Sequence, residues 1–379
     1  MTTTDPRSLP LPTVPRYGVD FWREALASPA LVGLGPYGPL GPPDIYGVRV
    51  PGGFRARVIG RSARPITGTG HTWHLHPSDG ATIATRDGGW VYVSNSQAGP
   101  GEGGASGIRF RQDGHIVDAY RVLDGTLGVR AGSRTPWGTW LAGETGRTGR
   151  LWECTPDRPG QGQMYPLAGS FDHGALAIDP RTGVVYLCEN DYDGRLYRYR
   201  PDIYGELSSG VLEAAKVRRS GHVDWVEVSS KHPERSDATS GFHRTDGAWF
   251  ADDALFITSA DARCVWAFDV RANELSLIYD AATMPVDAPM REPGTVTVHE
   301  RSGDILVAEY IDQPLLVLLA DASTRRVAAP FLELVGHGGS EITGIGFDPT
   351  GTRLYLSSLV GSDGSGLTFE VTGPFRRHR

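Results

Sequence analysis

A short strand-like pattern recurs six times along the chain, and this repeat restricts the possible folds more than any other feature. Each copy follows a turn, carries large apolar or aromatic residues, and closes on a small or polar residue. Successive copies end about 50 residues apart, except for one interval of about 70 residues. The copies end at Asn95, Gly143, Glu189, Ser259, Glu309 and Ser358.

The spacing of the repeat predicts a β-propeller, because a period of about 40–50 residues with several strands in each unit is typical of propeller blades. Six copies predict six blades and an all-β fold. The 50 glycines and 27 prolines lie between the apolar runs, as expected for many short strands joined by tight turns. A series of unrelated β-sandwich domains is the alternative, but it does not explain the regular spacing.

The repeat also divides the chain into regions. Residues 51–379 form the predicted six-bladed propeller, and residues 1–50 form a Pro-rich N-terminal arm with a short helical stretch near residues 20–30. The long interval holds an insertion at residues 203–242, in which "SSGVLEAAKVRR" predicts a helix over residues 208–219. We expect this insertion either to cover one face of the propeller as a lid or to be a plain surface excursion.

The composition excludes several classes of partner. The net charge of −7 and the absence of a basic run argue against nucleic acid, and no apolar run has the length of a transmembrane helix. The N-terminal sequence has no export signal, which predicts a cytoplasmic protein, although the mature form of an exported protein would look the same. Cys154, Cys188 and Cys264 form no C-x-x-C pair and are expected to be free thiols in a reducing compartment.

The ends of the repeat strands indicate where a site would lie. If each repeat strand is the innermost strand of its blade, the polar residues at its end converge on the propeller axis. Several carboxylates around one axial pocket suit a hard cation such as Ca²⁺, whereas the alternative is that they only bind channel water. The converging residues are Asn95, Gln97, Glu144, Glu189, Asn190, Ser259, Glu309 and Ser358.

Three longer motifs carry a family resemblance. They are "TPWGTWLAGE" from Thr135, "FDHGALAIDPRTGVVYL" from Phe171 and "EITGIGFDPTGTRLYLSS" from Glu341. With these motifs in this order, the chain resembles the short form of the PhoX-type alkaline phosphatase family from about residue 50 to its C-terminus. The fold of that family is a six-bladed propeller, in agreement with the repeat.

The resemblance implies a phosphomonoesterase with iron and calcium ions in the axial pocket and an arginine that clamps the transferring phosphoryl group. Arg244 matches the arginine of the family, and Asp246 occupies the position of the carboxylate that follows it. Further residues match acidic positions of the family and are the candidates for any metal site: Glu144, Glu189, Glu309 and Glu341.

The chain also departs from the family at ligand positions. Arg130 stands where the family has an iron-binding cysteine, and a fixed cation there would repel iron. The few remaining carboxylates cannot hold several ions without that thiolate, so we expect no di-iron centre and either no cofactor or one Ca²⁺. The other altered positions are Gln97, Thr145, Gly174, Asn190, Pro293, Gly294 and Tyr310.

We expect the altered pocket to take a small anionic metabolite, with Arg130 and Arg244 binding the anion. Acid–base chemistry by Glu144, Asp246 and His173 would make the protein a lyase, isomerase or cyclase that needs no metal. Further residues expected to contact the substrate are Trp137, Trp140, Tyr310, Asn95 and Gln97.

Two other functions stay open: a phosphomonoester hydrolase with a reduced calcium site, and a non-catalytic propeller that binds a ligand. Structural roles stay open for single residues as well. Trp137 and Trp140 are alternatively part of the blade core. Arg130 alternatively neutralises the remaining acids, and His173 is alternatively a hydrogen-bonded structural histidine.

Overall fold

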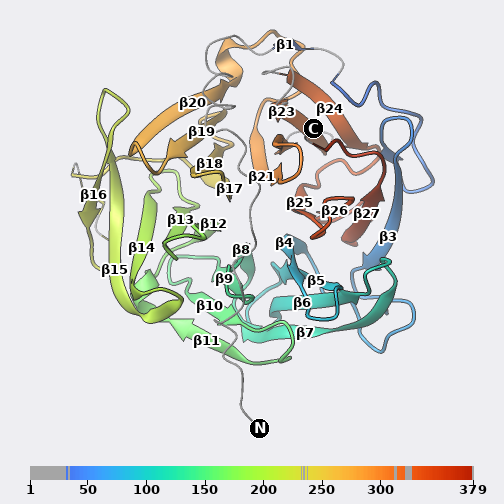
Figure 1. Cartoon of the computed structure of the whole chain (residues 1–379), viewed down its shortest axis with the longest axis horizontal. Coiled ribbons are helices and arrows are strands. Elements are labelled where there is room, and N and C mark those ends of the chain that lie inside the picture. The colour runs from blue at the N-terminus through green and yellow to red at the C-terminus, as the bar shows by residue number, and fades with distance from the viewer. Residues whose placement is uncertain are drawn as a thin grey trace.

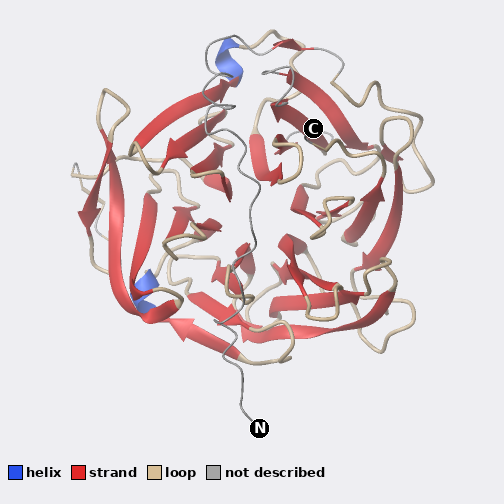
Figure 2. Ribbon diagram, viewed as in Figure 1, coloured by secondary structure: helices blue, strands red, loops and turns tan. Residues whose placement is uncertain are grey.

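The computed structural model describes residues 31–32, 35–310, 314–320 and 327–377, except residues 232, 234 and 237. In this part of the chain the strands form six sheets around a central axis (Figure 1). Helical structure is restricted there to short 3-10 turns such as η2 (Pro166–Ala168) and η3 (Ala281–Thr283), and the rest is strand and loop (Figure 2). The predicted all-β, six-bladed propeller is therefore confirmed.

The first three blades follow one another directly in the sequence. Blade one is β4 (Pro77–Ala84), β5 (Trp90–Ser96), β6 (Gly103–Phe110) and β7 (Ile116–Thr126). Blade two is β8 (Val129–Arg134), β9 (Trp140–Glu144), β10 (Leu151–Cys154) and β11 (Gly162–Tyr165). Blade three has five strands: β12 (His173–Ile178), β13 (Val185–Glu189), β14 (Leu196–Ile203), β15 (Glu206–Val217) and β16 (Val223–Glu227).

The last three blades bring the two ends of the chain together. Blade four is β17 (Thr245–Ala251), β18 (Ala254–Ser259), β19 (Cys264–Asp269) and β20 (Glu274–Asp280). Blade five is β21 (Pro293–His299), β22 (Asp304–Glu309), β23 (Leu315–Ala320) and β24 (Val327–Leu334), extended by β1 (Leu31–Val32) and β2 (Val48–Arg49). Blade six is β25 (Ile342–Phe347), β26 (Arg353–Ser358), β27 (Leu367–Thr372) and β3 (Arg55–Arg61).

Blade six closes the ring, because its outer strand comes from the N-terminal part of the chain and its other strands from the C-terminal part. β3 pairs antiparallel with β27, from Arg55 opposite Thr372 to Arg61 opposite Leu367. The described part of the predicted N-terminal arm lies against blade five, where β1 and β2 both pair with β24.

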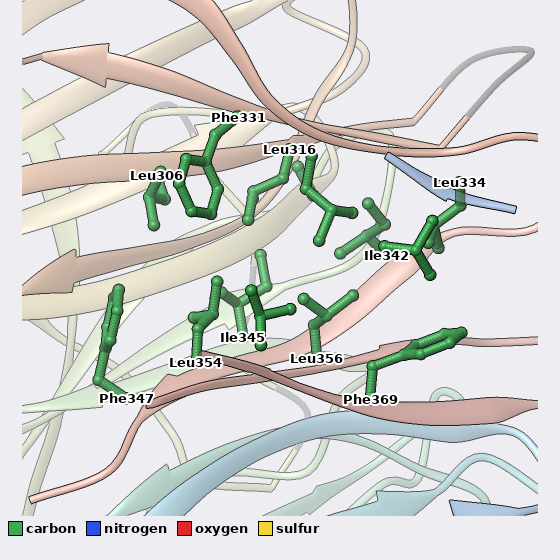
Figure 3. Packing of buried hydrophobic residues seen from close by; sticks show 14 of the residues in the cluster. Leu306, Leu316, Phe331, Leu334, Ile342, Ile345, Phe347, Leu354, Leu356 and Phe369 are labelled. Carbon is green, nitrogen blue, oxygen red and sulfur yellow. The ribbon is translucent and has the colours of Figure 1, made fainter. Parts of the chain in front are cut away.

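Apolar side chains between neighbouring blades form the core. Between blades five and six, Leu306 and Phe331 face Leu354, Leu356 and Phe369 across the gap between the sheets (Figure 3). All of these side chains are buried, so removal of their apolar surface from water holds the two sheets together. The blades therefore form a rigid frame for the residues at the axis.

The helix predicted over residues 208–219 is wrong. This segment belongs to β15, which pairs with β14 on one side and with β16 on the other. Its alanines and leucine favour a helix locally, but pairing on both sides and burial of Leu212, Ala214 and Ala215 favour a strand. The predicted insertion thus extends blade three before the chain returns to the axis. The helical stretch predicted near residues 20–30 lies outside the described residues.

The repeat strands are the second strands of their blades, not the innermost strands as we expected from the sequence. The innermost strands are β4, β8, β12, β17, β21 and β25, which lie nearest the centre in Figure 1 and contact one another around the axis. Because each blade is antiparallel, the end of every second strand pairs with the start of an innermost strand. The six pairs are Ser96–Pro77, Glu144–Val129, Glu189–His173, Ser259–Thr245, Glu309–Pro293 and Ser358–Ile342.

Other sequence predictions concern the cysteines and the membrane. Cys154, Cys188 and Cys264 are free, as predicted, and all are buried. Within the described ranges, no helix has the length and apolar character needed to cross a membrane.

Candidate functional site

A β-bulge near the start of each innermost strand shapes the axial face of the propeller. In all six of these strands the pairing register shifts within the first few residues. A bulged residue leaves the regular ladder, so its side chain points in a direction that pairing does not fix. Three of the bulged residues carry ionisable side chains, and these are Asp79 in β4, Arg130 in β8 and Asp246 in β17.

A buried ion pair between two of these bulges lies at the centre of the site. Arg130 Nη2 is 2.9 Å from Asp246 Oδ1 and 3.6 Å from Glu341 Oε2. Burial opposes the charge on Arg130, but Asp246 and Glu341 raise the pKa of its guanidinium above the ordinary value. For Asp246, burial is the stronger influence and raises the pKa, although Arg130 and Arg244 act against it. Direct contact between Arg130 and Asp246 therefore offsets the cost of burying their charges.

Arg244 lies next to this pair, immediately before β17. Its Nη2 donates a hydrogen bond of 3.0 Å to the Tyr310 hydroxyl, and its Nε is 3.8 Å from Asp246 Oδ2. The guanidinium also lies 5.2 Å from the centre of the Tyr310 ring. The backbone of Arg244 has φ of +41°, a conformation that costs a side-chain-bearing residue about 1–3 kcal/mol. Such strain is typical of residues whose position serves a site.

The residues around the ion pair line a narrow pocket. Five of the residues selected from the sequence lie here, namely Arg130, Asp246, Glu309, Tyr310 and Glu341. The space left between them is about 10 Å³, which is room for about one water molecule. The side chains thus nearly fill the pocket, and a larger ligand requires at least one of them to move.

Three predicted metal ligands accept hydrogen bonds from loop backbone. Glu144 accepts bonds of 3.0 and 3.1 Å from the N–H groups of Leu127 and Arg150. Glu309 accepts bonds from the N–H groups of Arg291, at 2.6 Å, and Glu292, at 3.0 Å. Glu189 accepts a bond of 3.1 Å from the N–H of the residue six positions later. These carboxylates therefore hold loops that follow their own strands or precede the innermost strands with which they pair.

The predicted insertion reaches one of these carboxylates. Arg235 Nη2 lies 2.5 Å from Glu189 Oε1, and Arg235 Nη1 lies 3.1 Å from Asp191 Oδ1. The Tyr197 hydroxyl also donates a bond of 3.1 Å to Glu189. The insertion thus brings a cation to blade three at the axial face, next to a residue that the family resemblance implies as a metal ligand.

Apart from Tyr310, the aromatic and amide residues predicted to contact substrate lie outside the pocket lining, in or beside the core. Trp140 is fully buried and donates a hydrogen bond of 2.9 Å to Asn95 Oδ1, whose amide group donates to the Ala131 carbonyl at 2.8 Å. Trp137 donates to Glu153 at 2.6 Å and packs in the core of blades two and three. The backbone N–H of Gln97 donates to a carbonyl outside the pocket, and its side chain does not line it. These positions favour the structural alternative for the tryptophans.

His173 is fully buried at the start of β12 and does not line the pocket. Its ring packs against Phe171 with 4.3 Å between the ring centres, and neither nitrogen has a hydrogen-bond partner among the described residues. Burial lowers its pKa to about 3, so the imidazole is neutral at physiological pH. The burial of the ring and its packing against Phe171 favour the structural alternative for His173 over a role as acid or base.

Asp79 is a candidate that sequence reasoning missed. Its Oδ2 accepts a hydrogen bond of 3.1 Å from the backbone N–H of Gly132, two residues beyond Arg130 in β8. Burial raises its pKa to about 7, with Arg130 lowering it and Asp246 raising it. The signal in the sequence was a lone aspartate in "HPSDG", outside the repeat and without a partner nearby in the chain.

The fold and the site together define a six-bladed propeller with a charged axial pocket. The model of the family "Alkaline phosphatase PhoX" matches residues 152–260, which confirms the resemblance to that family for this segment. No curated protein matches the chain in sequence.

Two solved structures show the same fold at low identity. A gluconolactonase from Xanthomonas campestris has 15% identity and a TM-score of 0.53, with 90% of this chain and 99% of that chain covered. A protein of unknown function from Dyadobacter fermentans has 10% identity and a TM-score of 0.50, with 86% and 100% covered. Both comparisons support the propeller architecture alone.

The residues present do not fit the iron–calcium centre that the PhoX resemblance implies. The Arg130 guanidinium lies between Asp246 and Glu341, where it takes the negative charge that a metal ion would need. Glu144 and Glu309 direct their oxygens to backbone N–H groups. Among the residues that the structure describes, no group of three or more His, Cys, Asp or Glu side chains is placed to hold a metal ion.

Proposed function

We propose that this protein is a propeller enzyme that binds the anionic group of a small metabolite and moves a proton on it, as a lyase, isomerase or cyclase, without a metal centre. The observation that carries the proposal is the contact of Arg130 with Asp246 and Glu341. The resemblance to the PhoX family implies an iron-binding cysteine at the position of Arg130. A guanidinium fixed in this way is a preorganised positive charge for an anion that forms during proton abstraction.

Arg244 supports the binding of an anionic group. Its side chain is 36% exposed, and its distances to the Asp246 and Asp261 carboxylates are long, at 3.8 and 3.6 Å. If its planar guanidinium turns to a carboxylate or phosphate, it exchanges its hydrogen bond to Tyr310 and these long contacts for a forked pair of charge-assisted hydrogen bonds. Arg130, held more tightly and deeper, would stay in place beside the reacting atoms.

The pocket also supplies groups for acid–base chemistry. Tyr310 lies between Arg244 and Glu341, and burial together with Glu341 raises the pKa of its hydroxyl above the ordinary value. Such a hydroxyl stays protonated and can donate to a developing anion. Glu144 and His173, which we selected from the sequence as catalytic residues, have contacts that favour structural roles.

Solvent deuterium exchange tests this proposal without knowledge of the reaction product. The protein is incubated in D₂O with EDTA and a panel of small hydroxy acids, 2-oxo acids and sugar phosphates, and C–H exchange is followed by NMR. We expect exchange into at least one compound, and an about 100-fold slower rate in Arg244→Met, because one preorganised donor contributes about that factor. Arg218→Met, at an exposed ion pair that is not part of the pocket lining, is the matched control.

A phosphomonoester hydrolase with a calcium site is the second candidate, because the PhoX model matches residues 152–260. Hydrolysis of a generic aryl phosphate that is lost in EDTA, with at least one equivalent of bound metal by elemental analysis, would support it and contradict the metal-free proposal. Tight binding of a panel compound with neither exchange nor hydrolysis would instead indicate a non-catalytic binding propeller.

A further inference from the structure

The two oxygens of the Asp246 carboxylate, which lines the axial pocket, have different surroundings. Oδ1 accepts a hydrogen bond of 2.9 Å from Arg130 Nη2, whereas Oδ2 is buried and has no hydrogen-bond partner among the described residues. The cation beside Oδ2 is Arg244, whose Nε is 3.8 Å away and thus beyond hydrogen-bonding distance. Because a buried carboxylate oxygen is costly without a donor, Oδ2 indicates the place of a donor from outside the described protein.

The backbone that carries Asp246 is fixed by the two neighbouring blades. The Thr245 hydroxyl donates a hydrogen bond of 3.2 Å to the Glu189 carbonyl of blade three. On the other side, a Cβ atom on Gly247 would lie 2.6 Å from the Gly294 carbonyl oxygen of blade five, so glycine is required for this close approach. Asp246 lies between these two anchored residues, at the bulge of β17. Its unbonded oxygen therefore has a defined position in the pocket.

The size of the pocket admits only a very small donor group. The space of about 10 Å³ has room for about one water molecule, and a primary ammonium or a hydroxyl group is of similar size. The other atoms of a ligand must lie outside this space. The cation next to Asp246 on that side is Arg244, which does not line the pocket and is partly exposed. The geometry thus suits a ligand with a small donor inside and an anionic group outside.

The charge of the pocket favours a cationic donor over a neutral one. Among the described residues that line it, Asp246, Glu309 and Glu341 carry carboxylates, whereas Arg130 carries a guanidinium. Arg244 adds a second cation beside the lining. Burial disfavours the charged form of Asp246, and a ligand cation in contact with Oδ2 would favour it. A primary ammonium group therefore suits this place better than a hydroxyl group.

The spacing of Asp246 and Arg244 determines how far apart the two charges of the ligand should be. The acceptor Oδ2 and the donor Nε are 3.8 Å apart. In a 2-amino acid, the ammonium nitrogen and the carboxylate carbon are about 2.5 Å apart, as follows from the N–Cα and Cα–C bond lengths and the angle between them. Both charged groups of such a ligand can therefore contact Oδ2 and the Arg244 guanidinium at the same time.

We propose that the substrate of the axial pocket is a small zwitterion, a 2-amino acid or a close derivative, whose ammonium group binds Asp246 Oδ2 and whose carboxylate binds Arg244. This inference names the substrate class of the proposed function and rests on the anion-binding role given there to Arg244. Arg130 positions the Asp246 carboxylate through Oδ1. Specificity comes from Oδ2, because an N-methylated nitrogen without N–H groups leaves this oxygen without a hydrogen bond.

Calorimetric titration of the wild-type protein with three matched probes tests the ammonium contact. The probes are glycine, glycolate, in which a hydroxyl replaces the ammonium, and glycine betaine, whose trimethylated nitrogen has no N–H and is too large for the pocket. We expect glycine to bind at least about 10-fold more tightly than glycolate, because hydrogen bonds between charged groups are the stronger ones, and betaine not to bind. Glycolate binding as tight as that of glycine, or binding of betaine, would overturn the proposal.

Two variants assign the two contacts of the ligand. Asp246→Asn keeps an oxygen for Arg130 and replaces Oδ2 with an N–H donor, so the Kd of glycine should rise about 10- to 100-fold and that of glycolate at most about fivefold. Arg244→Met should weaken both probes alike. Asp261→Asn, at a carboxylate 3.6 Å from Arg244 that does not line the pocket, is the matched control and should change the Kd of glycine at most about fivefold. Equal weakening of both probes by Asp246→Asn would contradict the contact with Oδ2.

Sulfate, which carries an anionic group alone, separates this proposal from the proposed function. Binding of sulfate or glycolate without binding of glycine would overturn the zwitterion and leave the anion site of the proposed function intact. Failure of sulfate and of all three probes to bind would contradict both. If Asp246→Asn does not fold, the comparison of glycine, glycolate and betaine on the wild type decides the proposal without it.

Discussion

In the two inner strands of blade two, two charged residues that lie one pairing position apart contact different parts of the molecule. Glu144, at the end of β9, pairs in register with Val129 and turns its carboxylate to the N–H groups of two loops. Arg130, the next residue in β8, is bulged out of the ladder and turns to Asp246 across the axis. On one hairpin, Glu144 thus binds the loops, whereas Arg130 at the neighbouring position contacts residues at the propeller axis.

The difference has a simple physical origin. A strand end lies beside loop N–H groups that have no ladder partner, and a carboxylate there satisfies them. A bulged residue has no cross-strand partner, so its side chain is free to meet residues from other blades. Acidic residues at strand ends therefore stabilise the propeller frame, whereas bulged residues provide the side chains of the axial site. The following predictions test this difference between frame and site.

The largest effect is expected from loss of the central ion pair. Arg130→Met leaves the Asp246 side chain, which is 1% exposed, without its closest partner. Removal of one member of a buried pair costs about 3–5 kcal/mol, and we expect a loss of this size in the free energy of unfolding by chemical denaturation. Arg130→Met combined with Asp246→Leu should recover most of the loss, since no buried charge remains from the pair. A double variant as unstable as the single one would show that Arg130 contributes mainly by packing.

The next effect concerns pH and the bulge in β4. Folded Asp79 ionises near pH 7, whereas in the unfolded chain it ionises near 3.8, so unfolding releases a proton between these values. Stability from this group is therefore present at low pH and is lost as the pH rises from about 4 to 7, at about 1.4 kcal/mol per pH unit. The pH dependence from His173 has the opposite sign, because its folded pKa of about 3 lies below the value of 6.5 in the unfolded chain. This contribution is the same in the wild type and in Asp79→Asn, so it cancels when the two are compared.

Denaturation of wild type and Asp79→Asn at pH 5, 6 and 7 measures this slope. The stability of the wild type relative to the variant should fall steadily over the range, and parallel curves would show that Asp79 ionises normally. Asp87→Asn, whose carboxyl is exposed, should run parallel to the wild type.

A smaller effect is expected at the acidic strand end. Glu144→Gln removes the charge from an acceptor of two backbone N–H bonds, which are worth about 1.5–3 kcal/mol for a charged group. We expect a loss of at most this size, with the Leu127 and Arg150 amides showing faster hydrogen exchange. Protected amides at both positions in the variant would argue that Glu144 does not hold these loops.

The sequence predicts the frame of this molecule better than its site, for a physical reason. Every blade needs a buried second strand, so its pattern repeats and reveals six blades. A bulge depends on pairing between strands, and nothing in "HPSDG" indicates that Asp79 meets the Gly132 N–H some 53 positions away. Arg130 and Asp246 could be selected only because the resemblance marks their positions. The wrong helix in β15 has the same origin, since its partners β14 and β16 decide its conformation.

The smallest effect, and the closest test of the division between frame and site, is expected at Gly132. A methyl group there would meet Trp140 and Asn95 at 2.2 and 2.7 Å, and overpacking of this kind costs about 1–3 kcal/mol. Gly132→Ala should lower the unfolding free energy within that range and also raise the pKa of Asp79, measured as the midpoint of its carboxyl band in an infrared pH titration, because the N–H that favours its carboxylate is displaced. Gly52→Ala, where a Cβ would meet no atom within 4 Å, should change neither quantity. A loss of stability with an unchanged pKa of Asp79 would show that the packing of Trp140 against Gly132 stabilises the fold and does not affect the Asp79 carboxyl.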